Sequence, residues 1–299
     1  MDGLLNINKA TGMTSHDVVA KVRKILKQKR VGHAGTLDPA ASGVLPICLG
    51  QGTRVAEYLS DSGKAYRGEI VFGTVTDTYD TEGTILRTTN VEQLTLAQIE
   101  EVLPRFLGLQ MQVPPRYSAI KLQGQPAYKR MRAGENIELE QRPIEITSLE
   151  VLAWHAPRLT LAIECSKGTY IRSLAYDLGE QLGCGAYLGG LIRTRSGPFT
   201  LSGSITLSQL EEAVTASKVQ DYLHPVDSAL QNYPAIHLDT PTAESVLHGN
   251  AFRYRLNLTI ATPVLARVYS SNGHFVAIAE WKEEDEMWQP KKVFSTDCV

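Results

Sequence analysis

The sequence predicts an α+β fold, in which strands and helices occupy different stretches of the chain. Residues 4–8 and 159–165 have the composition of short strands, and the second stretch alternates cleanly between apolar and polar side chains. Residues 14–28 instead repeat apolar side chains at helical spacing. With 299 residues and 43% hydrophobic content, the chain can bury a sizeable core as one large domain or two smaller ones.

Composition excludes several classes of protein. No apolar run approaches the length of a membrane span, and the first residues lack the basic-then-apolar pattern of a signal peptide. The four cysteines, Cys48, Cys165, Cys184 and Cys298, are far apart and show no paired spacing. This argues against a zinc site or a disulfide framework and for a reducing compartment. We therefore expect a cytoplasmic protein that has no membrane partner, binds no metal and uses no cofactor.

The net charge of −2 conceals two basic blocks. Residues 1–54 carry 8 Lys and Arg against 3 Asp and Glu, and residues 111–200 carry 11 against 8. Binding to a polyanion depends on a local basic surface more than on the total charge. These two blocks are where contacts with a nucleic acid are expected.

The first basic block contains the predicted helix over residues 14–28, which Thr14 or Ser15 can cap. Six cations fall within the ten residues 21–30, with no acid among them, so the helix gains nothing from internal ion pairs. This favours contact with phosphates, although a solvated surface helix is the common alternative. Further along, residues 67–73 resemble a strand, and Thr95 is expected to cap a helix that ends near Leu107.

The stretch of residues 102–134, which overlaps the start of the second basic block, contains no acidic residue. Prolines 114 and 115 make a continuous helix unlikely across it. Cations and tyrosines alternate along it, which suits a clamp on nucleic acid, because cations bind phosphates and rings stack on bases. The alternative is a surface loop with a basic bias. The cations expected to contact the RNA backbone are Arg116, Lys121, Arg130 and Arg132.

Residues 157–198 form a second compact unit with a strand, a turn over 166–169 and a helix that runs through Gly179. Two X-Pro pairs, at 224–225 and 233–234, mark a connector. We therefore expect one domain over residues 1–234, with an RNA-binding insertion at about 110–140, and a small β-rich domain over residues 235–299. The latter should contain three short strands and a brief helix near residues 242–248.

One octapeptide, GHAGTLDP over residues 32–39, presents a single carboxylate, Asp38, in a tight loop. Gly32 and Gly35 allow the chain to turn and a ligand to approach the backbone, and Pro39 disfavours helix at Asp38. The run continues as AASGVLP. The whole stretch resembles the catalytic-aspartate motif of the TruB family of tRNA pseudouridine synthases.

Five further stretches resemble motifs of the same family, in the same order and mostly within residues 1–200. They are the opening NINK with GMTS, the Lys64-Ala65-Tyr66 strand, PPRYSAIK at 114–121, GTYIRSL at 168–174 and the segment 183–199. The segment 235–299 is similar to the PUA-like RNA-binding domains that end such proteins. The resemblance implies a central mixed, mainly antiparallel sheet flanked by helices and loops, followed by a small PUA-like β-barrel.

The resemblance also implies an activity and a partner. The reaction is the isomerisation of one uridine in the T loop of tRNA, at position 55, to pseudouridine. The partner is tRNA, bound through its T arm, and no obligate protein partner is implied. The reaction breaks the C1′–N1 bond, turns the uracil and forms a C1′–C5 bond, so it needs neither a metal nor a redox cofactor. Whether the carboxylate attacks the sugar or the base stays open.

Family motifs assign roles to individual residues. Asp38 is the expected nucleophile and Arg172 its partner. Tyr66 is expected to stack on the uracil and to move a proton, and His33 to fill the gap that the flipped base leaves. Tyr170 and Leu191 are expected to line the uracil pocket, and Lys9 and Lys64 to contribute to substrate binding.

Three alternatives remain at this point. A non-catalytic tRNA-binding or tRNA-folding chaperone on the same fold would keep the basic segments without needing Asp38. A metal-independent glycosidase would normally need a second carboxylate, and none lies near Asp38 in the sequence. A guide-RNA-dependent relative that acts on ribosomal RNA would be expected to carry basic tails, which this sequence lacks.

Overall fold

The computed structural model describes residues 1–115, 121–122, 125–126, 139–256 and 264–294. The α-helices in these ranges are α1 (Ser15–Leu26), α2 (Ala56–Asp61), α3 (Leu96–Val102), α5 (Ile171–Gln181), α6 (Leu207–Thr215) and α7 (Thr240–Leu247). Short 3₁₀ turns cover Gly50–Val55, Leu103–Phe106, Val219–Tyr222 and Val226–Leu230. None of the helices in these ranges is both long and apolar enough to cross a membrane.

The largest element is a ten-stranded sheet with the order β14-β1-β3-β12-β4-β11-β10-β7, in which β13 pairs with β12 and β2 with β3. Its strands are β1 (Gly3–Lys9), β2 (Val31–His33), β3 (Ser42–Leu49), β4 (Lys64–Phe72), β7 (Gly108–Gln112), β10 (Arg142–His155), β11 (Arg158–Cys165), β12 (Ala186–Ser196), β13 (Phe199–Thr200) and β14 (Leu223–His224). Two hairpins lie outside it: β5 (Thr74–Thr76) with β6 (Ile85–Thr88), and β8 (Lys121–Leu122) with β9 (Gln125–Pro126). Among the described residues, every strand pair of the ten-stranded sheet is antiparallel except β12 with β3. The predicted mixed, mainly antiparallel sheet in an α+β fold is therefore confirmed.

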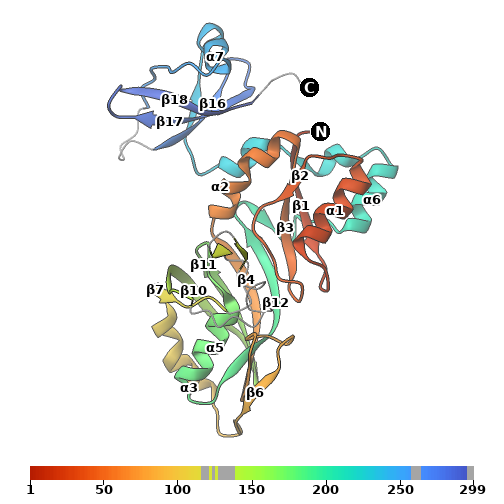
Figure 1. The fold of residues 1–299 in the computed structure, drawn as a ribbon, viewed down its shortest axis with the longest axis vertical. Coiled ribbons are helices and arrows are strands. Elements are labelled where there is room, and N and C mark those ends of the chain that lie inside the picture. The colour runs from red at the N-terminus through yellow and green to blue at the C-terminus, as the bar shows by residue number, and fades with distance from the viewer. Residues whose placement is uncertain (116–120, 123–124, 127–138, 257–263, 295–299) are drawn as a thin grey trace.

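Two apolar cores divide this sheet into halves. In the half built on β1 and β3, apolar side chains of α1 and α6 pack on one face of the strands, around Leu5, Ile47 and Val18. In the half built on β4, β10 and β11, α5 and α3 supply the cover, around Ile70, Leu161 and Leu174. Figure 1 shows the two halves as separate lobes joined along β12.

Local signals explain where the helices of these lobes begin. Thr14 caps α1 through a reciprocal pair of hydrogen bonds with Asp17, and Thr95 caps α3 in the same way with Gln98. The cap at Thr95 was predicted, and Thr14 is one of the two caps, Thr14 or Ser15, that the sequence offered for α1. The second helix is shorter than expected: it ends at Val102, and the 3₁₀ turn with Pro104 at its start follows, because proline cannot continue the α-helical hydrogen bonding.

The C-terminal part forms a four-stranded sheet in the order β15-β16-β17-β18, covered by α7. The strands are β15 (Ala235–His237), β16 (Leu265–Tyr269), β17 (Phe275–Lys282) and β18 (Met287–Val293). The PUA-like barrel that the family resemblance implies is not seen, because within the described ranges β15 and β18 are outer strands and do not pair with each other. Ile278 and Phe294 of this part join the core that contains Leu4 and Leu59, so the two sheets are packed together.

Candidate active site

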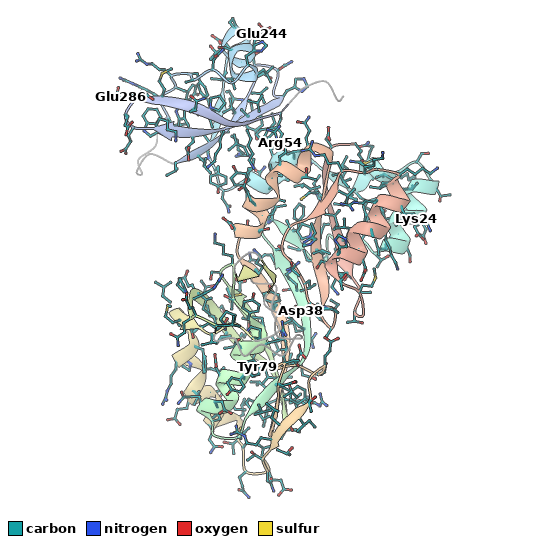
Figure 2. The ribbon with its side chains drawn as sticks, viewed as in Figure 1. Lys24, Asp38, Arg54, Tyr79, Glu244 and Glu286 are labelled. Carbon is teal, nitrogen blue, oxygen red and sulfur yellow. The ribbon has the colours of Figure 1, made fainter. Side chains whose placement is uncertain are left out.

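The candidate site is a cavity of about 300 Å³ between the two halves of the large sheet. Figure 2 places Asp38 where the two lobes meet. Six of the eight residues predicted to contact substrate line this cavity: Asp38, Lys64, Tyr66, Tyr170, Arg172 and Leu191. These residues span more than 150 positions of the chain, so the fold brings together what the sequence could group only by resemblance.

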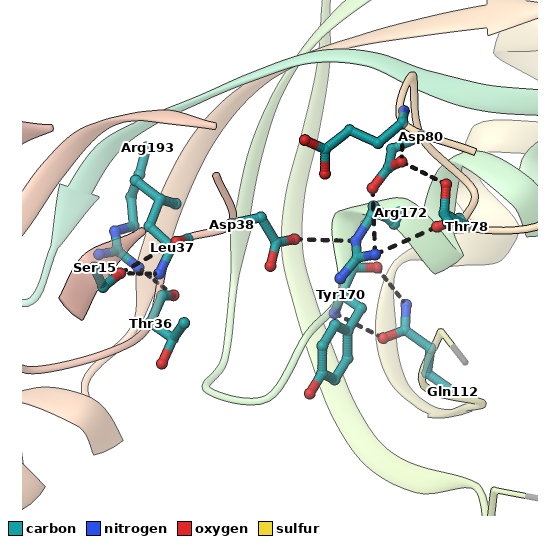
Figure 3. Close-up of polar contacts among 11 residues, drawn as sticks. Ser15, Thr36, Leu37, Asp38, Thr78, Asp80, Gln112, Tyr170, Arg172 and Arg193 are labelled. Carbon is teal, nitrogen blue, oxygen red and sulfur yellow. Dashed lines mark hydrogen bonds and ion pairs between the residues drawn. The ribbon is translucent and has the colours of Figure 1, made fainter. Parts of the chain in front are cut away.

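Asp38 is held by an arginine that is itself held by a second aspartate. The Arg172 Nε lies 3.0 Å from Oδ2 of Asp38, and its Nη1 lies 3.2 Å from Oδ2 of Asp80. The Arg172 and Asp80 side chains are only 7% and 9% exposed, whereas that of Asp38 is 40% exposed. The guanidinium is thus fixed between two carboxylates, one buried and one open to the cavity (Figure 3).

The loop that carries Asp38 is fastened by residues of the opening motif. The Ser15 hydroxyl accepts a hydrogen bond from the Leu37 amide at 2.9 Å and donates to the Leu37 carbonyl at 3.1 Å. The Gly12 amide donates to the Pro39 carbonyl at 2.8 Å. The residues on both sides of Asp38 are therefore fixed through their backbone groups, while its carboxylate, paired with Arg172, stays 40% exposed.

Lys9 is fully buried and also helps to hold the loop that carries Asp38. Its ammonium donates to the carbonyls of Ala10, Met13 and Pro39, at 3.0, 2.7 and 3.3 Å. Burial lowers the pKa of Lys9 to about 8, an effect that nearby Asp38 partly opposes. Lys9 is not among the described residues that line the cavity, so its position suits support of the loop rather than direct contact with substrate.

Lys64 lines the cavity, but its ammonium points into the protein. It donates to the carbonyls of Leu59, Ser60 and Ser62, around the end of α2. Burial, together with the nearby charge of Arg193, lowers the pKa of Lys64 to about 8. Its stem faces the cavity while its charge stabilises the end of a helix, where cations are favourable.

Tyr66 lies on β4, directly opposite Arg193 on β12. Burial raises the pKa of the Tyr66 phenol, and the positive charge of the Arg193 guanidinium opposes this effect. The ring lines the cavity that Asp38 also lines. A base in this cavity would therefore meet both an aromatic face and a phenol whose proton is under the influence of a buried cation.

Tyr170 and Arg172 both line the cavity because α5 begins there. The Tyr170 amide donates to Gln112 Oε1 at 2.8 Å, and Gln112 Nε2 donates back to the Tyr170 carbonyl at 3.1 Å. One turn later, the Ser173 hydroxyl donates to the Val113 carbonyl at 2.7 Å. The buried Gln112 thus holds the start of α5 against β7, and with it the position of Arg172.

His33 is placed behind the loop rather than in the cavity. It is half-buried on β2 and is not among the described residues that line the cavity. Burial lowers its pKa, with smaller contributions from Arg193 and His16. Its Nδ1 is buried and has no hydrogen-bond partner within the described ranges.

Three of the four cations expected to contact RNA, Arg116, Arg130 and Arg132, lie outside the described residues. The fourth, Lys121, begins the short strand β8, and its side chain is not described. The basic helix is α1, where Lys24 projects from the surface of the lobe in Figure 2.

Sequence reasoning missed two residues of the site, Asp80 and Arg193. No role in the site was predicted for the acidic loop 77–83, which contains Asp80. No group of three or more His, Cys, Asp or Glu side chains suited to a metal occurs in the described ranges. The signal that could have found Asp80 is the charge balance: an arginine expected to be buried beside one carboxylate favours a second. Arg193 lies in a stretch that resembled the family, but nothing local distinguishes it from Arg195.

The arrangement suits nucleophilic chemistry by one carboxylate. Asp38 is the single carboxylate among the described residues that line the cavity. Glycosidases of the usual kind place two carboxylates on either side of the bond, so this geometry does not favour that alternative. An oriented carboxylate, an aromatic ring and a phenol proton are the groups that a planar, ribose-linked base would meet.

Two family models match the chain. The model described as "TruB family pseudouridylate synthase (N terminal domain)" matches residues 23–171, and the one described as "tRNA pseudouridylate synthase B C-terminal domain" matches residues 172–231. The first match contains Asp38 and Tyr66, and the second begins at Arg172.

Curated relatives are similar over their full length. A protein of Dehalococcoides mccartyi named tRNA pseudouridine synthase B is 45% identical over 298 residues, covering 100% of this chain and 98% of its own. A protein of Stutzerimonas stutzeri with the same name is 41% identical over 300 residues, covering 99% of this chain and 97% of its own.

Solved structures show the same architecture. A chain from a Cbf5-Nop10-Gar1 complex has a TM-score of 0.76 at 27% identity and is matched over 98% of this chain and 85% of its own. A chain from an H/ACA RNP bound to a substrate RNA containing 2′-deoxyuridine has a TM-score of 0.74 at 25% identity, over 98% and 85% of the two chains.

Proposed function

The chain belongs to the TruB family of pseudouridylate synthases, and we propose that it converts the uridine at position 55 in the T loop of tRNA to pseudouridine with Asp38 as the nucleophile. It is a tRNA pseudouridine synthase, an isomerase that acts on tRNA. The T-loop position and the roles of single residues form the proposed part.

The observation that carries the proposal is the ion pair between Asp38 and Arg172 at the edge of the cavity. The arginine is fixed on its other side by Asp80, so the carboxylate is oriented before any ligand arrives. Attack on a nucleoside requires a nucleophilic oxygen that faces the bound base. The Asp38 carboxylate supplies such an oxygen in the cavity that Tyr66 also lines.

The reaction conserves all atoms. The C1′–N1 bond breaks, the uracil turns within the cavity, and a C1′–C5 bond forms; the proton leaves C5 and N1 gains one. Asp38 supplies the electron pair, either to C1′ or to the base, and is regenerated when product forms. Tyr66 is placed to relay the proton, its phenol giving up its own proton as it takes one from C5, because it shares the cavity with Asp38 and is the strand partner of Arg193.

Access to the target requires that the base leave its stack. Extruding a nucleotide costs on the order of a few kcal/mol. Stacking of the base on an aromatic ring returns about 1–3 kcal/mol. Tyr66 supplies that ring, while Tyr170 and Leu191 close the cavity around the base.

The remaining binding energy comes from the phosphates of the T arm. The exposed cations of α1 and the basic stretch that includes Arg116, Lys121, Arg130 and Arg132 are the proposed contacts. The segment 235–299 is proposed as a further RNA-binding domain, because the proposed substrate is larger than the cavity can recognise.

The test is conversion of an unmodified tRNA transcript by the purified protein, followed by mapping of pseudouridine at every uridine. We expect one modified position, in the T loop. Asp38→Asn keeps the size of the side chain and removes its charge, so it should bind the transcript and yield no pseudouridine. Modification elsewhere would refute the T-loop assignment, and turnover by Asp38→Asn would refute the nucleophile. Refolding of tRNA with no modification would favour the chaperone alternative.

A further inference from the structure

Arg193 is a buried cation at the centre of the large sheet. It lies on β12 and is 1% exposed. Within the described ranges no carboxylate forms an ion pair with it. A buried charge without a paired counter-ion is rare, because its desolvation must be offset by hydrogen bonds. The partners of the guanidinium therefore indicate what it does.

All three guanidinium nitrogens donate to carbonyls of the segment that carries Asp38. Nη2 donates to Gly35 at 3.1 Å, Nη1 to Thr36 at 3.3 Å, and Nε to Val44 at 2.7 Å. The first two carbonyls precede Asp38 by three and two residues, and the third follows it by six. Arg193 thus ties the two ends of the loop together (Figure 3 shows the contact with Thr36).

The backbone of Arg193 reinforces this connection. Arg193 pairs with Gly43 in the parallel contact between β12 and β3. A Cβ on Gly43 would lie 2.3 Å from the Arg193 carbonyl oxygen, so only glycine permits this approach. Side chain and backbone therefore both fasten the same loop.

On its other side Arg193 faces Tyr66. The two residues are direct partners in the antiparallel pairing of β12 with β4. The guanidinium lowers the pKa of the Tyr66 phenol and so opposes the effect of burial, and both side chains line the cavity. One side chain therefore binds the loop that carries Asp38 and lies opposite the ring that would stack on the base.

We propose that Arg193 is a positioning residue, whose planar guanidinium holds the Asp38 loop and the Tyr66 phenol in one rigid frame. This inference rests on the proposed function and adds to it the group that sets the distance between nucleophile and ring. Arginine suits the task because its fork of five N–H donors can serve several acceptors in fixed directions, which a lysine ammonium cannot reproduce.

The test compares Arg193→Lys with Arg195→Lys. Arg195 lies two residues further along the same strand, but it is half-buried and pairs with Glu164 at 2.9 Å. Conversion is measured in single turnover at saturating enzyme, and rates are normalised to the fraction of protein that binds tRNA. We expect Arg193→Lys to lose about 100-fold in rate, the loss that a misplacement of about 1 Å can cause, with little change in tRNA affinity. Arg195→Lys should keep the wild-type rate.

A double-variant cycle separates positioning from simple stability. If Arg193 acts partly through the phenol, Arg193→Lys combined with Tyr66→Phe should lose less rate than the product of the two single losses. Amide hydrogen exchange should also rise over residues 34–41 in Arg193→Lys, while the amides paired between β1 and β3 stay protected.

The outcomes are distinct. Failure of the wild-type protein to form pseudouridine would refute the proposed function, independently of Arg193. A wild-type rate in Arg193→Lys, or strictly multiplicative losses in the double variant, would overturn the positioning role. If Arg193→Lys does not fold, Arg193→Gln, which keeps two donors, replaces it; failure of both to fold would also overturn the proposal in favour of a purely structural role.

Discussion

The second aspartate of the site, Asp80, offers the sharpest test of how Arg172 is held. Its Oδ2 accepts from Arg172 Nη1 at 3.2 Å, and its Oδ1 accepts from the Thr78 hydroxyl at 2.5 Å and the Glu82 amide at 3.0 Å. Three donors thus converge on one carboxylate. Asp80→Asn has the same shape but replaces one oxygen by an NH₂ group, which must face either the guanidinium or the donors of the loop.

The loss of stability in Asp80→Asn can be estimated from these contacts. A hydrogen bond to a charged group contributes about 1.5–3 kcal/mol to stability, and Asp80→Asn removes one inside the protein. Unfolding entropy is about 2.1 cal/mol/K per residue, so for 299 residues the midpoint of thermal unfolding should fall by about 2–5 °C. The larger effect is expected on the reaction. With one side released, the guanidinium no longer orients Asp38, and the single-turnover rate should fall by about 100-fold.

The assay measures the two quantities separately. Thermal unfolding gives the stability change, and single-turnover conversion of tRNA at saturating enzyme gives the rate. Asp77→Asn is the matched control: it lies in the same loop, and its Oδ1 accepts from the Thr84 amide at 2.8 Å, a role that an asparagine oxygen can keep. A wild-type rate in Asp80→Asn, or an equal loss in Asp77→Asn, would show that Arg172 does not need the second carboxylate.

Further predictions concern the other groups of the cavity. Tyr66→Phe should bind tRNA and flip the base but convert it far more slowly, whereas Tyr66→Leu should also reduce flipping, as reported by a fluorescent base analogue. Excess chelator should leave the rate unchanged once the tRNA is folded. Burial lowers the pKa values of Lys9 and Lys64 from 10.5 to about 8, so the folded chain loses these protons first. Between pH 8 and 10.5 the unfolded chain then holds more protons, and this contribution to the free energy of unfolding rises with pH. The rate should nevertheless fall above pH 8, because a neutral amine has too few donors for three carbonyls.

The sequence predicted those parts of the fold that depend on neighbouring residues. The start of α1 follows from Thr14 and Asp17, three residues apart, and α5 follows a Gly-containing turn. Strands β4 and β11 were visible from their composition and alternation. Such features need only a short window of sequence, and they place the elements correctly to within a few residues.

Contacts between distant residues could not be predicted in this way. Asp80 and Arg172 are 92 residues apart, and Arg193 reaches carbonyls 149 to 158 residues away. Which arginine of β12 faces inward depends on register, and the pairing of β12 with β4 shifts at two positions. No periodicity in the sequence fixes where such shifts occur. The roles assigned to Lys9 and Lys64 came from family motifs, which do not reveal that both ammonium groups serve carbonyls.

The way the site is built implies a division of labour between the protein and the RNA. Lys9, Ser15 and Arg193 fasten the Asp38 loop through its backbone in the absence of substrate. Little binding energy is then needed to order Asp38, so under the proposed mechanism the energy of RNA binding can be used to extract the base. In the proposed mechanism, stacking on Tyr66 would return only part of the few kcal/mol that flipping costs, and phosphate contacts would have to supply the rest. Substitutions in the buried frame should therefore lower the rate at saturating enzyme, whereas neutralising cations on α1 should weaken binding and reduce its dependence on salt.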